Sequence, residues 1–340
     1  RWIPGPKVQI GDIDMRKAAV FVVASICIMI ASCGTVTDDM HINTVTPSAG
    51  STSGENEVLL TGRGFIADST VTFGDENAVV VSVESTKIKV IAPPADETGS
   101  VDITLTDPDG AETTKSSGYA YQSVLYVANK GSGQIVGFDF DSSTSKILEF
   151  SPTAAGGNFP IGLAHDSRTQ TLYAAHSATI SEFTYSFENG SLVALRDPVS
   201  AEATGVNELA FDATNRLLFT SNFGSSTVSS FTSDDETGEL KFVENDGGAG
   251  REPYDVAIDE GGKFLFLANN ATNDIAVFTY RSTGVLDEVA GSPFGDGVSQ
   301  PVALAVDREY DLLFCVNFNS NNFTVFSYGD DGALRRERVI

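Results

Sequence analysis

A unit of about 47 residues recurs along residues 124–340, and this repeat restricts the possible folds more than any other feature of the chain. Leu-aromatic pairs mark its copies at Leu125-Tyr126, Leu172-Tyr173, Leu218-Phe219, Leu265-Phe266 and Leu313-Phe314, with spacings of 47, 46, 47 and 48 residues. An Asp stands six residues before each of the last four pairs, at Asp166, Asp212, Asp259 and Asp307. Such units bury their apolar faces against neighbouring copies, so the copies must form one array.

Each complete copy holds four short β-patterned segments and lacks helical periodicity. Four strands in a unit of this length are typical of a β-propeller blade, whereas a parallel β-helix has shorter rungs. The first copy has only its second to fourth strands, because Tyr119–Tyr121 is assigned to the preceding domain, so we expect its first strand from the C-terminus. The chain stops near Arg338-Val339-Ile340, at the fourth strand of the fifth copy. We therefore interpret it as a fragment with an incomplete propeller.

The repeat resembles a known family of propellers. The segments Leu125-Tyr126-Val127-Ala128-Asn129 and Leu265-Phe266-Leu267-Ala268-Asn269, with Pro-x-x-x-Ala-x-Asp at Pro253 and Pro301, are similar to YVTN and lactonase-like (phosphogluconolactonase-type) propellers. The resemblance spans residues 124–340 and implies seven blades, of which this chain would hold about five. It also implies that lactone hydrolysis is a candidate activity, although a fold by itself does not establish one.

A separate all-β module is expected over residues 42–122. Strands bounded by Gly, Pro and Asp are predicted at Glu57–Thr61, Thr70–Phe73, Ala78–Val83, Lys87–Ile91, Ser100–Thr106 and Tyr119–Tyr121. This spacing fits a small immunoglobulin-like sandwich. The positions Gly62-x-Gly64-Phe65, Val71-x-Phe73-Gly74 and Tyr119-x-Tyr121 resemble the IPT/TIG family, which implies a spacer or protein-contact module and does not imply catalysis.

The N-terminal region has the pattern of an export signal. Residues 1–14 are interpreted as translated upstream sequence, and residues 15–32 as a signal peptide in which Arg16 and Lys17 precede the apolar run Ala18–Ile30. The run ends in Ile30-Ala31-Ser32-Cys33-Gly34, which resembles a bacterial lipobox and implies lipidation of Cys33, a tether over 33–41 and outer-membrane sorting. An ordinary signal peptide with an incidental Cys, or a short buried helix, is the alternative.

The charge and the cysteine and histidine content of the chain disfavour several classes of partner and site. The chain has 46 acidic and 21 basic residues and a formal charge of −25, which disfavours nucleic acid. Its three cysteines predict no disulfide framework, and Cys315 is expected to pack as a small apolar residue in a strand. Three His without CxxC, HExxH or clustered carboxylates predict no metal site and no cofactor.

Residues that recur in every copy can be distinguished from residues of a functional site, because a structural residue is needed in each copy and a catalytic residue is needed only once. The Asp column is expected to accept hydrogen bonds from the backbone of the following turn. An Asn column, formed by Asn129, Asn222, Asn269 and Asn317, is expected to satisfy the turn after the second strand. His165 lies in a first strand, in the place of Phe211, Ile258 and Val306, and is expected to be a core histidine.

The candidate site is indicated by a position at which one copy departs from the residue that the other copies share. His176 replaces Asn in the second copy, so His176 as general base and Arg251 as an anion-holding residue are the candidate catalytic pair. Loops on the same face contribute candidate ligand-binding residues, which are Asn129, Lys130, Phe159 and Glu252. A turn-satisfying or surface role for His176 is the alternative.

Two functions follow from these residues. The first is a lipid-anchored, non-catalytic binding or scaffold protein of the cell envelope, whose partner is an envelope protein or a carbohydrate. The second is a lactone hydrolase that acts in a propeller pocket, although only Lys130 and Arg251 are candidates to hold a phosphate.

Overall fold

The computed structural model describes residues 40–141, 146–149, 159–187, 190–247, 250–259 and 263–340, and these form β-strands joined by turns and loops. The expected signal peptide, the lipidation site Cys33 and all but the end of the tether lie outside the described residues. Among the described residues, no helix is long and apolar enough to cross a membrane.

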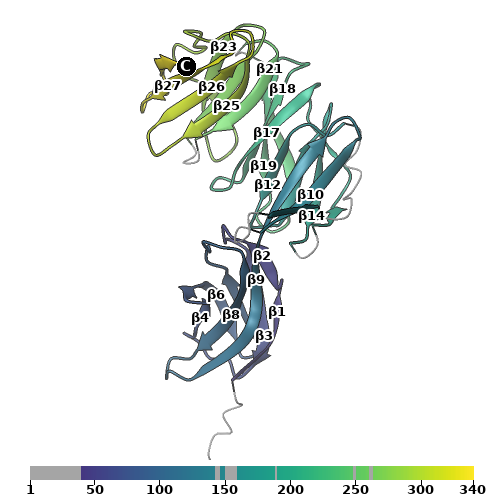
Figure 1. The fold of residues 1–340 in the computed structure, drawn as a ribbon, viewed down its shortest axis with the longest axis vertical. Helices are drawn as coiled ribbons and strands as arrows, with labels where there is room; N and C mark the ends of the chain where they lie inside the picture. The colour runs from purple at the N-terminus through teal and green to yellow at the C-terminus, as the bar shows by residue number, and fades with distance from the viewer. Residues whose placement is uncertain (1–39, 142–145, 150–158, 188–189, 248–249, 260–262) are drawn as a thin grey trace, which may run out of the picture.

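Residues from Met40 to about Gln122 form a two-sheet sandwich, in the lower part of Figure 1. One sheet has the order β1 (His41–Thr46), β3 (Glu57–Arg63), β7 (Lys87–Ile91) and β6 (Val79–Glu84). The other contains β5 (Glu76–Asn77), β4 (Thr70–Phe73), β8 (Gly99–Thr106), β9 (Glu112–Asn129) and, parallel to β9, β2 (Ala49–Ser51). The expected sandwich is confirmed; β1, β2 and β5 were not predicted.

The sandwich core lies between the two sheets. Alternating side chains such as Leu60, Ile88 and Ile103 are fully buried there. Tyr119 packs edge-on against Phe73, with ring centroids 5.0 Å apart. Removal of these apolar side chains from water provides the main stabilisation of the module.

The strand β9 is 18 residues long and belongs to both domains. Its first part pairs with β8, and its last part pairs with β10 (Gln134–Asp141), which in turn pairs with β11 (Lys146–Glu149). The sequence interpretation placed two strands here, with a domain boundary at residue 123. They are one strand because Tyr119–Asn129 contains no Gly or Pro and is rich in residues that favour strands.

Four further sheets follow, each with four consecutive antiparallel strands. Blade 2 comprises β12 (Leu163–Asp166), β13 (Thr171–Ala175), β14 (Thr179–Tyr185) and β15 (Leu192–Ala194), with the short β16 (Val199–Ser200) also on β14. Blade 3 comprises β17 (Val206–Asp212), β18 (Leu217–Asn222), β19 (Thr227–Ser233) and β20 (Leu240–Asp246). Blade 4 comprises β21 (Pro253–Ile258), β22 (Phe264–Asn269), β23 (Asp274–Tyr280) and β24 (Leu286–Glu288). Blade 5 comprises β25 (Pro301–Asp307), β26 (Leu312–Asn317), β27 (Asn322–Tyr328) and β28 (Leu334–Val339).

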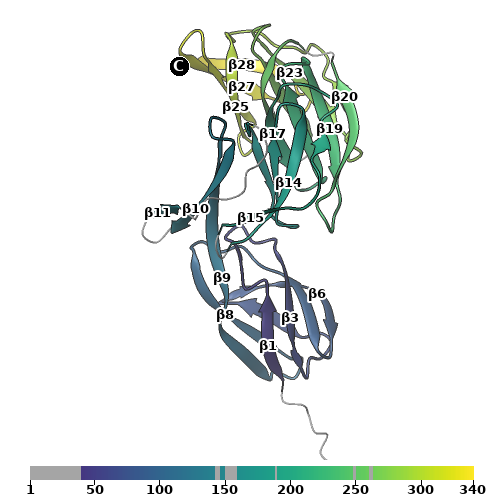
Figure 2. The ribbon, with the colours of Figure 1, turned by 90° about the vertical axis from the view of Figure 1, so that its right-hand side faces the viewer.

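The first strands of blades 2–5, here called inner strands, lie next to one another in chain order. We refer to the sheet of β9, β10 and β11 as blade 1, which has no inner strand among the described residues. The blades follow an arc above the sandwich (Figures 1 and 2). The structure is therefore all-β, with a sandwich followed by propeller blades, as the repeat predicted.

Apolar clusters between successive blades hold the arc together. The cluster between blades 3 and 4, for example, joins Phe219 and Val228 to Leu265 and Phe278. Cys315 is fully buried between blades 4 and 5, and burial raises the pKa of its thiol to about 12, so its expected role as an apolar core residue is confirmed.

The Asp column caps the turns between the inner and second strands, as predicted. The carboxylates of Asp166, Asp212 and Asp307 each accept a hydrogen bond from the N–H two residues later, at 2.9–3.1 Å. The turn after Asp259 includes residues outside the described ranges. These turns define one end of the blades, the turn face, and Ser167 in the turn of blade 2 contacts Glu55 and Asn56 of the sandwich.

Candidate functional site

The opposite end of the blades, the loop face, carries a cavity of about 330 Å³. It is built by the loops between second and third strands and by the segments entering inner strands. The lining residues are Lys130, Phe159, Ile161, Ser177, Gly205, Val206, Asn207, Phe223 and Tyr254. Of the expected ligand-binding residues, the structure brings Lys130 and Phe159 together here, from two loops about 30 residues apart in the chain.

Aromatic side chains dominate the lining. Phe159, Phe223 and Tyr254 are each exposed to solvent by a third or more of their surface. Phe223 and Tyr254 meet edge to face, with ring centroids 5.8 Å apart and an interplanar angle of 89°. Partly exposed rings around a cavity offer flat apolar surfaces on which a ligand ring can stack.

The polar groups of the cavity are few. The side-chain amide of Asn207 donates a hydrogen bond to the carbonyl of Tyr254, which joins the inner strands of blades 3 and 4 at this end. The carbonyl of Ser177 accepts a hydrogen bond of 2.6 Å from the N–H of Gly205, which fixes two of the lining loops. Lys130 is exposed, and among the described lining residues it is the only one with a charged side chain. The arrangement can therefore bind a ligand with one anionic group and an apolar face.

The backbone of Phe159 has a left-handed conformation, with φ of 59°. Gly205, Glu252 and Gln300 hold the same place before the next three inner strands, and all three also have positive φ. A left-handed residue costs about 1–2 kcal/mol when it is not glycine. The conformation is thus part of the repeat, whereas the aromatic side chain at this place is specific to the loop that enters blade 2.

His176 occupies the Asn column, as the sequence indicated, and it is only 5% exposed. The column residues of the next blades are fully buried and bind the following turn; Asn222, for example, donates to Thr227 and Ser229. The structural role expected for the Asn column is confirmed in blades 3–5. The structure places His176 at this turn position, beside Ser177 of the cavity but outside the lining.

Arg251 is exposed in the loop that enters blade 4, and its backbone N–H donates a hydrogen bond to the side-chain hydroxyl of Thr272. Glu252 and Asn129 are also exposed, and neither they nor Arg251 belong to the cavity lining. The structure therefore does not bring the candidate catalytic pair, His176 and Arg251, together in this cavity.

Sequence reasoning missed Asn207, Phe223 and Tyr254 of the cavity. Phe223 follows the Asn column directly, at the place that Lys130 holds in blade 1. Asn207 and Tyr254 occupy one place in two successive inner strands, where blades 2 and 5 have Ile161 and Val302. A comparison of these two variable columns across the copies would have found all three residues.

Two carboxyl groups on neighbouring inner strands also escaped the sequence interpretation. Burial, together with the charge of Asp255, raises the pKa of Glu208 to about 7. Burial raises the pKa of Asp255 to about 6. Asp255 accepts hydrogen bonds from the N–H groups of Val256 and Leu304, and the second of these bonds, at 2.6 Å, connects blade 4 to blade 5.

These carboxyl groups are not part of the cavity lining. Glu208 directly follows Asn207, and Asp255 directly follows Tyr254, and the pairing of each inner strand with its second strand shifts register at these two lining residues. Their hydrogen bonds give them a structural role between inner strands. Among the described residues, no group of three or more His, Cys, Asp or Glu side chains is placed to hold a metal ion.

Comparison with known proteins matches the two regions to two families. Residues 40–123 match the IPT/TIG domain, and residues 178–297 match the family described as lactonase, 7-bladed beta-propeller. No curated protein sequence matches the chain.

Several solved structures share the fold at low sequence identity. A candidate 6-phosphogluconolactonase from Bacteroides uniformis is 16% identical, with a TM-score of 0.55 over 80% of this chain and 96% of that one. The periplasmic gluconolactonase of Pseudomonas aeruginosa is also 16% identical, with a TM-score of 0.54 over 80% and 82%. A protein from Lactobacillus plantarum is 15% identical, with a TM-score of 0.56 over 88% and 83%.

The family matches agree with the topology, in which blades 2–5 each have four antiparallel strands in chain order. The chain therefore carries an IPT/TIG domain followed by blades of a lactonase-like β-propeller.

Proposed function

We propose that this protein is an exported, lipid-anchored binding protein of the bacterial cell envelope, in which the IPT/TIG domain holds a ligand-binding propeller away from the membrane. One observation carries the proposal: the sandwich and the cavity lie at opposite ends of the single strand β9. Its N-terminal part belongs to the sandwich, and Lys130 follows its last residue. The hairpin of β9 and β10 points away from the sandwich in Figure 2.

A shared strand makes the sandwich a stiff support. A flexible linker would let the propeller rotate, whereas a continuous strand fixes its direction. Side-chain bonds reinforce the junction: Asn56 donates to the carbonyl of Ser167, and the hydroxyls of Thr52 and Ser123 are 3.2 Å apart. With a lipid on Cys33, this geometry would direct the loop face outwards.

The proposed ligand is a carbohydrate that carries a carboxylate. Its ring would stack on Phe223 or Tyr254, and its carboxylate would pair with Lys130. A cavity of about 330 Å³ has the size of a small sugar ligand. The described lining residues offer aromatic rings and one cation, and among these residues there is neither a His nor a carboxylate to act as general base, which favours binding over catalysis.

Calorimetric titration with gluconate tests the proposed ligand. We expect Lys130→Ala to weaken binding about tenfold, the usual size of a lost charged hydrogen bond, and Tyr254→Ala to weaken it further. Lys241→Ala, which removes an exposed lysine from strand β20, is the matched control and should bind as the parent chain does. Equal affinity in Lys130→Ala and the parent chain would reject the cavity as the carboxylate site.

Labelling with radioactive lipid tests the anchor. The expected result is incorporation in the parent chain and none in Cys33→Ala. Incorporation that persists in Cys33→Ala would reject the lipobox assignment.

Lactone hydrolysis is the second candidate function, and the lactonase match over residues 178–297 favours it. An assay with gluconolactone would compare the parent chain with His176→Ala and Arg251→Ala. Loss of activity in both variants would support hydrolysis at the pair expected from the sequence. Activity that is unchanged in both variants would exclude that pair as the catalytic residues.

A further inference from the structure

The side-chain amide of Asn207 belongs to the cavity on the loop face, and only one of its two polar ends is bonded to the protein. Its nitrogen donates the hydrogen bond of 2.5 Å to the carbonyl of Tyr254. Only the NH₂ group can make this bond, because a carbonyl oxygen accepts hydrogen bonds and does not donate them. Within the described part of the chain, the amide oxygen Oδ1 accepts no hydrogen bond. This oxygen is therefore available as an acceptor for a ligand.

A second hydrogen bond holds the carbonyl of Tyr254 in place. The N–H of Glu208 donates to the hydroxyl of Ser221 at 3.0 Å, and this hydroxyl donates to the carbonyl of Tyr254 at 3.4 Å. The carbonyl thus accepts from both Ser221 and Asn207, which matches the two lone pairs of a carbonyl oxygen. Both donors come from blade 3, so the partner of the Asn207 amide is itself fixed.

Asn207 and Tyr254 each occupy an irregular place in their sheet. The pairing of β17 with β18 shifts register at Asn207, and the pairing of β21 with β22 shifts register at Tyr254. An extra residue in one strand of an antiparallel pair redirects its side chain and is frequent next to functional sites. The two register shifts therefore account for the presence of both residues in one cavity lining.

The blades do not need an amide at the place of Asn207. Blade 2 has Ile161 and blade 5 has Val302 there. Between blades 4 and 5, a bond from a side-chain amide to an inner-strand carbonyl is made from another place, by Asn270 to Pro301 at 3.2 Å. The amide in the cavity is therefore a feature of blade 3 and is not part of the repeat.

We propose that Asn207 is a specificity-determining residue whose Oδ1 accepts a hydrogen bond from a hydroxyl group of the ligand. The inference rests on the proposed function, because it places the ligand in the same cavity. Lys130 would pair with the carboxylate, and the rings of Phe223 and Tyr254 would contact the apolar face. Asn207 would then select ligands that carry hydroxyl groups. The ligand class is thereby narrowed to hydroxylated ring carboxylates such as uronic acids.

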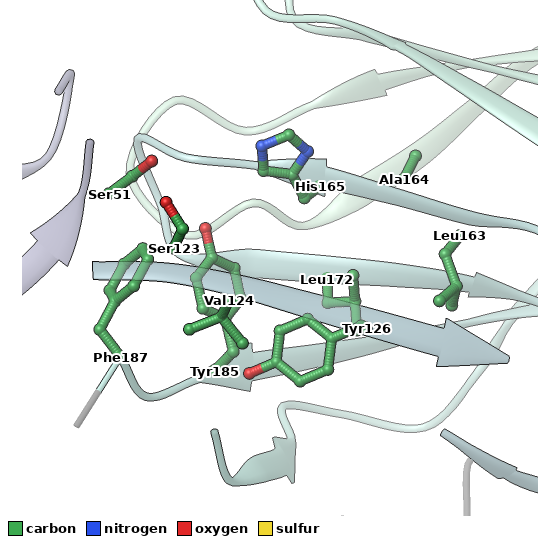
Figure 3. A pocket seen from close by; sticks show the side chains of 10 residues that line it. All are labelled: Ser51, Ser123, Val124, Tyr126, Leu163, Ala164, His165, Leu172, Tyr185 and Phe187. Atoms are coloured by element: carbon green, nitrogen blue, oxygen red, sulfur yellow. The ribbon is translucent and has the colours of Figure 1, made fainter. Parts of the chain in front are cut away.

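Another cavity, of about 300 Å³, lies between β9 and β12 and serves as a comparison (Figure 3). Its lining includes the hydroxyl groups of Ser123 and Tyr126. The first of these is hydrogen-bonded to the hydroxyl of Thr52, and the second donates to the carbonyl of Gly190. These polar groups are bonded within the protein, whereas Oδ1 of Asn207 is not. The cavity on the loop face is therefore the better candidate for recognition of a hydroxylated ligand.

His165 also lines this other cavity, although the sequence predicted a core position for it. The prediction is wrong, because His165 is exposed. The residues at the same place in blades 3–5 pack against apolar clusters, and these are Phe211, Ile258 and Val306. The physical reason for the difference is that His165 borders a cavity instead of packed side chains. A substitution of His165 therefore alters this cavity and leaves the loop face unchanged.

Calorimetric titration of the full chain with two ligands tests the role of Asn207. Glucuronate has a six-membered ring, a carboxylate and hydroxyl groups, and cyclohexanecarboxylate has the ring and the carboxylate without the hydroxyl groups. We expect Asn207→Ala to weaken glucuronate binding about tenfold and cyclohexanecarboxylate binding less than about twofold, because the lost acceptor serves only a hydroxyl donor. If Asn207 only positions Tyr254, its loss weakens both ligands equally, and that result would overturn the proposal.

Lys130→Ala separates this proposal from the proposed function. It should weaken both ligands to the same extent, because both carry a carboxylate. If Lys130→Ala weakens glucuronate binding and Asn207→Ala does not, the carboxylate site stands and the role of Asn207 is rejected. If the parent chain does not bind glucuronate, or binds it as tightly as Lys130→Ala does, the proposed function fails and the role of Asn207 fails with it.

Three further variants complete the test. Asn207→Val replaces Asn207→Ala if circular dichroism shows that the alanine variant does not fold, because blade 5 has Val302 at this place. Asn270→Ala removes the amide bond to an inner-strand carbonyl outside the lining, and His165→Ala alters the other cavity. Both controls should bind the two ligands as the parent chain does. A loss of glucuronate binding in Asn270→Ala as large as in Asn207→Ala would assign the effect to blade packing, and such a loss in His165→Ala would place the ligand in the other cavity. Either result would overturn the proposal.

Discussion

Two second strands with nearly the same sequence differ sharply in burial. Blade 1 has Leu125-Tyr126-Val127-Ala128-Asn129, and blade 4 has Leu265-Phe266-Leu267-Ala268-Asn269. Leu265 and Leu267 are 0% and 2% exposed, whereas Leu125 and Val127 are 48% and 38% exposed. Both segments are strands in antiparallel sheets. The local sequence therefore determines the strand, and the neighbouring blades determine what the strand contributes to stability.

Blade 4 has a blade on each side, and blade 1 has a described blade on one side only. Apolar clusters cover blade 4 from blade 3 and from blade 5. Blade 1 contributes Ile135, Val124 and Tyr126 to a cluster with blade 2 on one face. Substitutions at equivalent places of the two blades test this contrast between a middle blade and an end blade.

The largest effect is expected from truncating the leucines. Leu265→Ala should lower the free energy of unfolding by about 2–5 kcal/mol, because it leaves a cavity in a packed core. Leu125→Ala should lower it by less than about 1 kcal/mol, because half of this side chain already contacts water. Urea unfolding followed by circular dichroism measures both values, and equal losses would contradict the contrast.

A pH effect of intermediate size is expected from Glu208. The raised pKa, about 7, means that the folded state holds this proton more tightly than the unfolded state does. The contribution of the protonated Glu208 to the stability of the fold is therefore fully present below about pH 4.5, and it is lost as the pH rises through about 7. Glu208→Gln should remove this loss and stabilise the protein by roughly 3 kcal/mol at pH 8.

Thermal unfolding at pH 5 and pH 8 checks the Glu208 prediction. The difference between the parent chain and Glu208→Gln should be small at pH 5 and larger at pH 8. Blades 2 and 5 have Gly162 and Ala303 at the place of Glu208, so this pH effect on stability is expected only from the carboxyl groups of blades 3 and 4. A variant that is less stable than the parent at pH 8 would show that the charged form is preferred.

The smallest effect is expected from the Asn column. Asn269 is fully buried and donates a hydrogen bond of 2.8 Å to Asp274, so Asn269→Ala should cost about 1–2 kcal/mol. Asn129 is exposed, and Asn129→Ala should stay within about 0.5 kcal/mol of the parent chain. Chemical unfolding of both variants resolves the difference. A larger loss in Asn129→Ala would mean that the exposed column residue holds its turn more firmly than the buried one.

Most of the fold could be predicted from the sequence because its signals are local and repeated. The Leu-aromatic pairs place the second strands, and the Asp column places the turns, where Asp166, Asp212 and Asp307 make the expected bonds. The continuity of β9 was missed, since the alternation near Tyr121 and Leu125 was divided by an assumed domain boundary. Only pairing with β8 and β10 shows that one strand serves both domains.

The candidate site was predicted less completely. Lys130 and Phe159 were placed by the sequence in loops of one face, and both line the cavity; their role in ligand binding stays a prediction. His176 attracted attention as a break in the Asn column, but the structure buries it at a turn. Phe223 and Tyr254 were missed because their places vary between copies and carry no motif.

The sequence by itself determined the strands, the turns and the order of the two domains, since alternation, turn residues and the period of the repeat act over short distances. The tertiary structure decided which copies of one pattern are buried, which carboxyl groups have raised pKa values, and which loops meet around a cavity. These properties depend on packing between segments far apart in the chain. Two copies with almost identical residues, such as those at Leu125 and Leu265, can therefore differ in everything except their secondary structure.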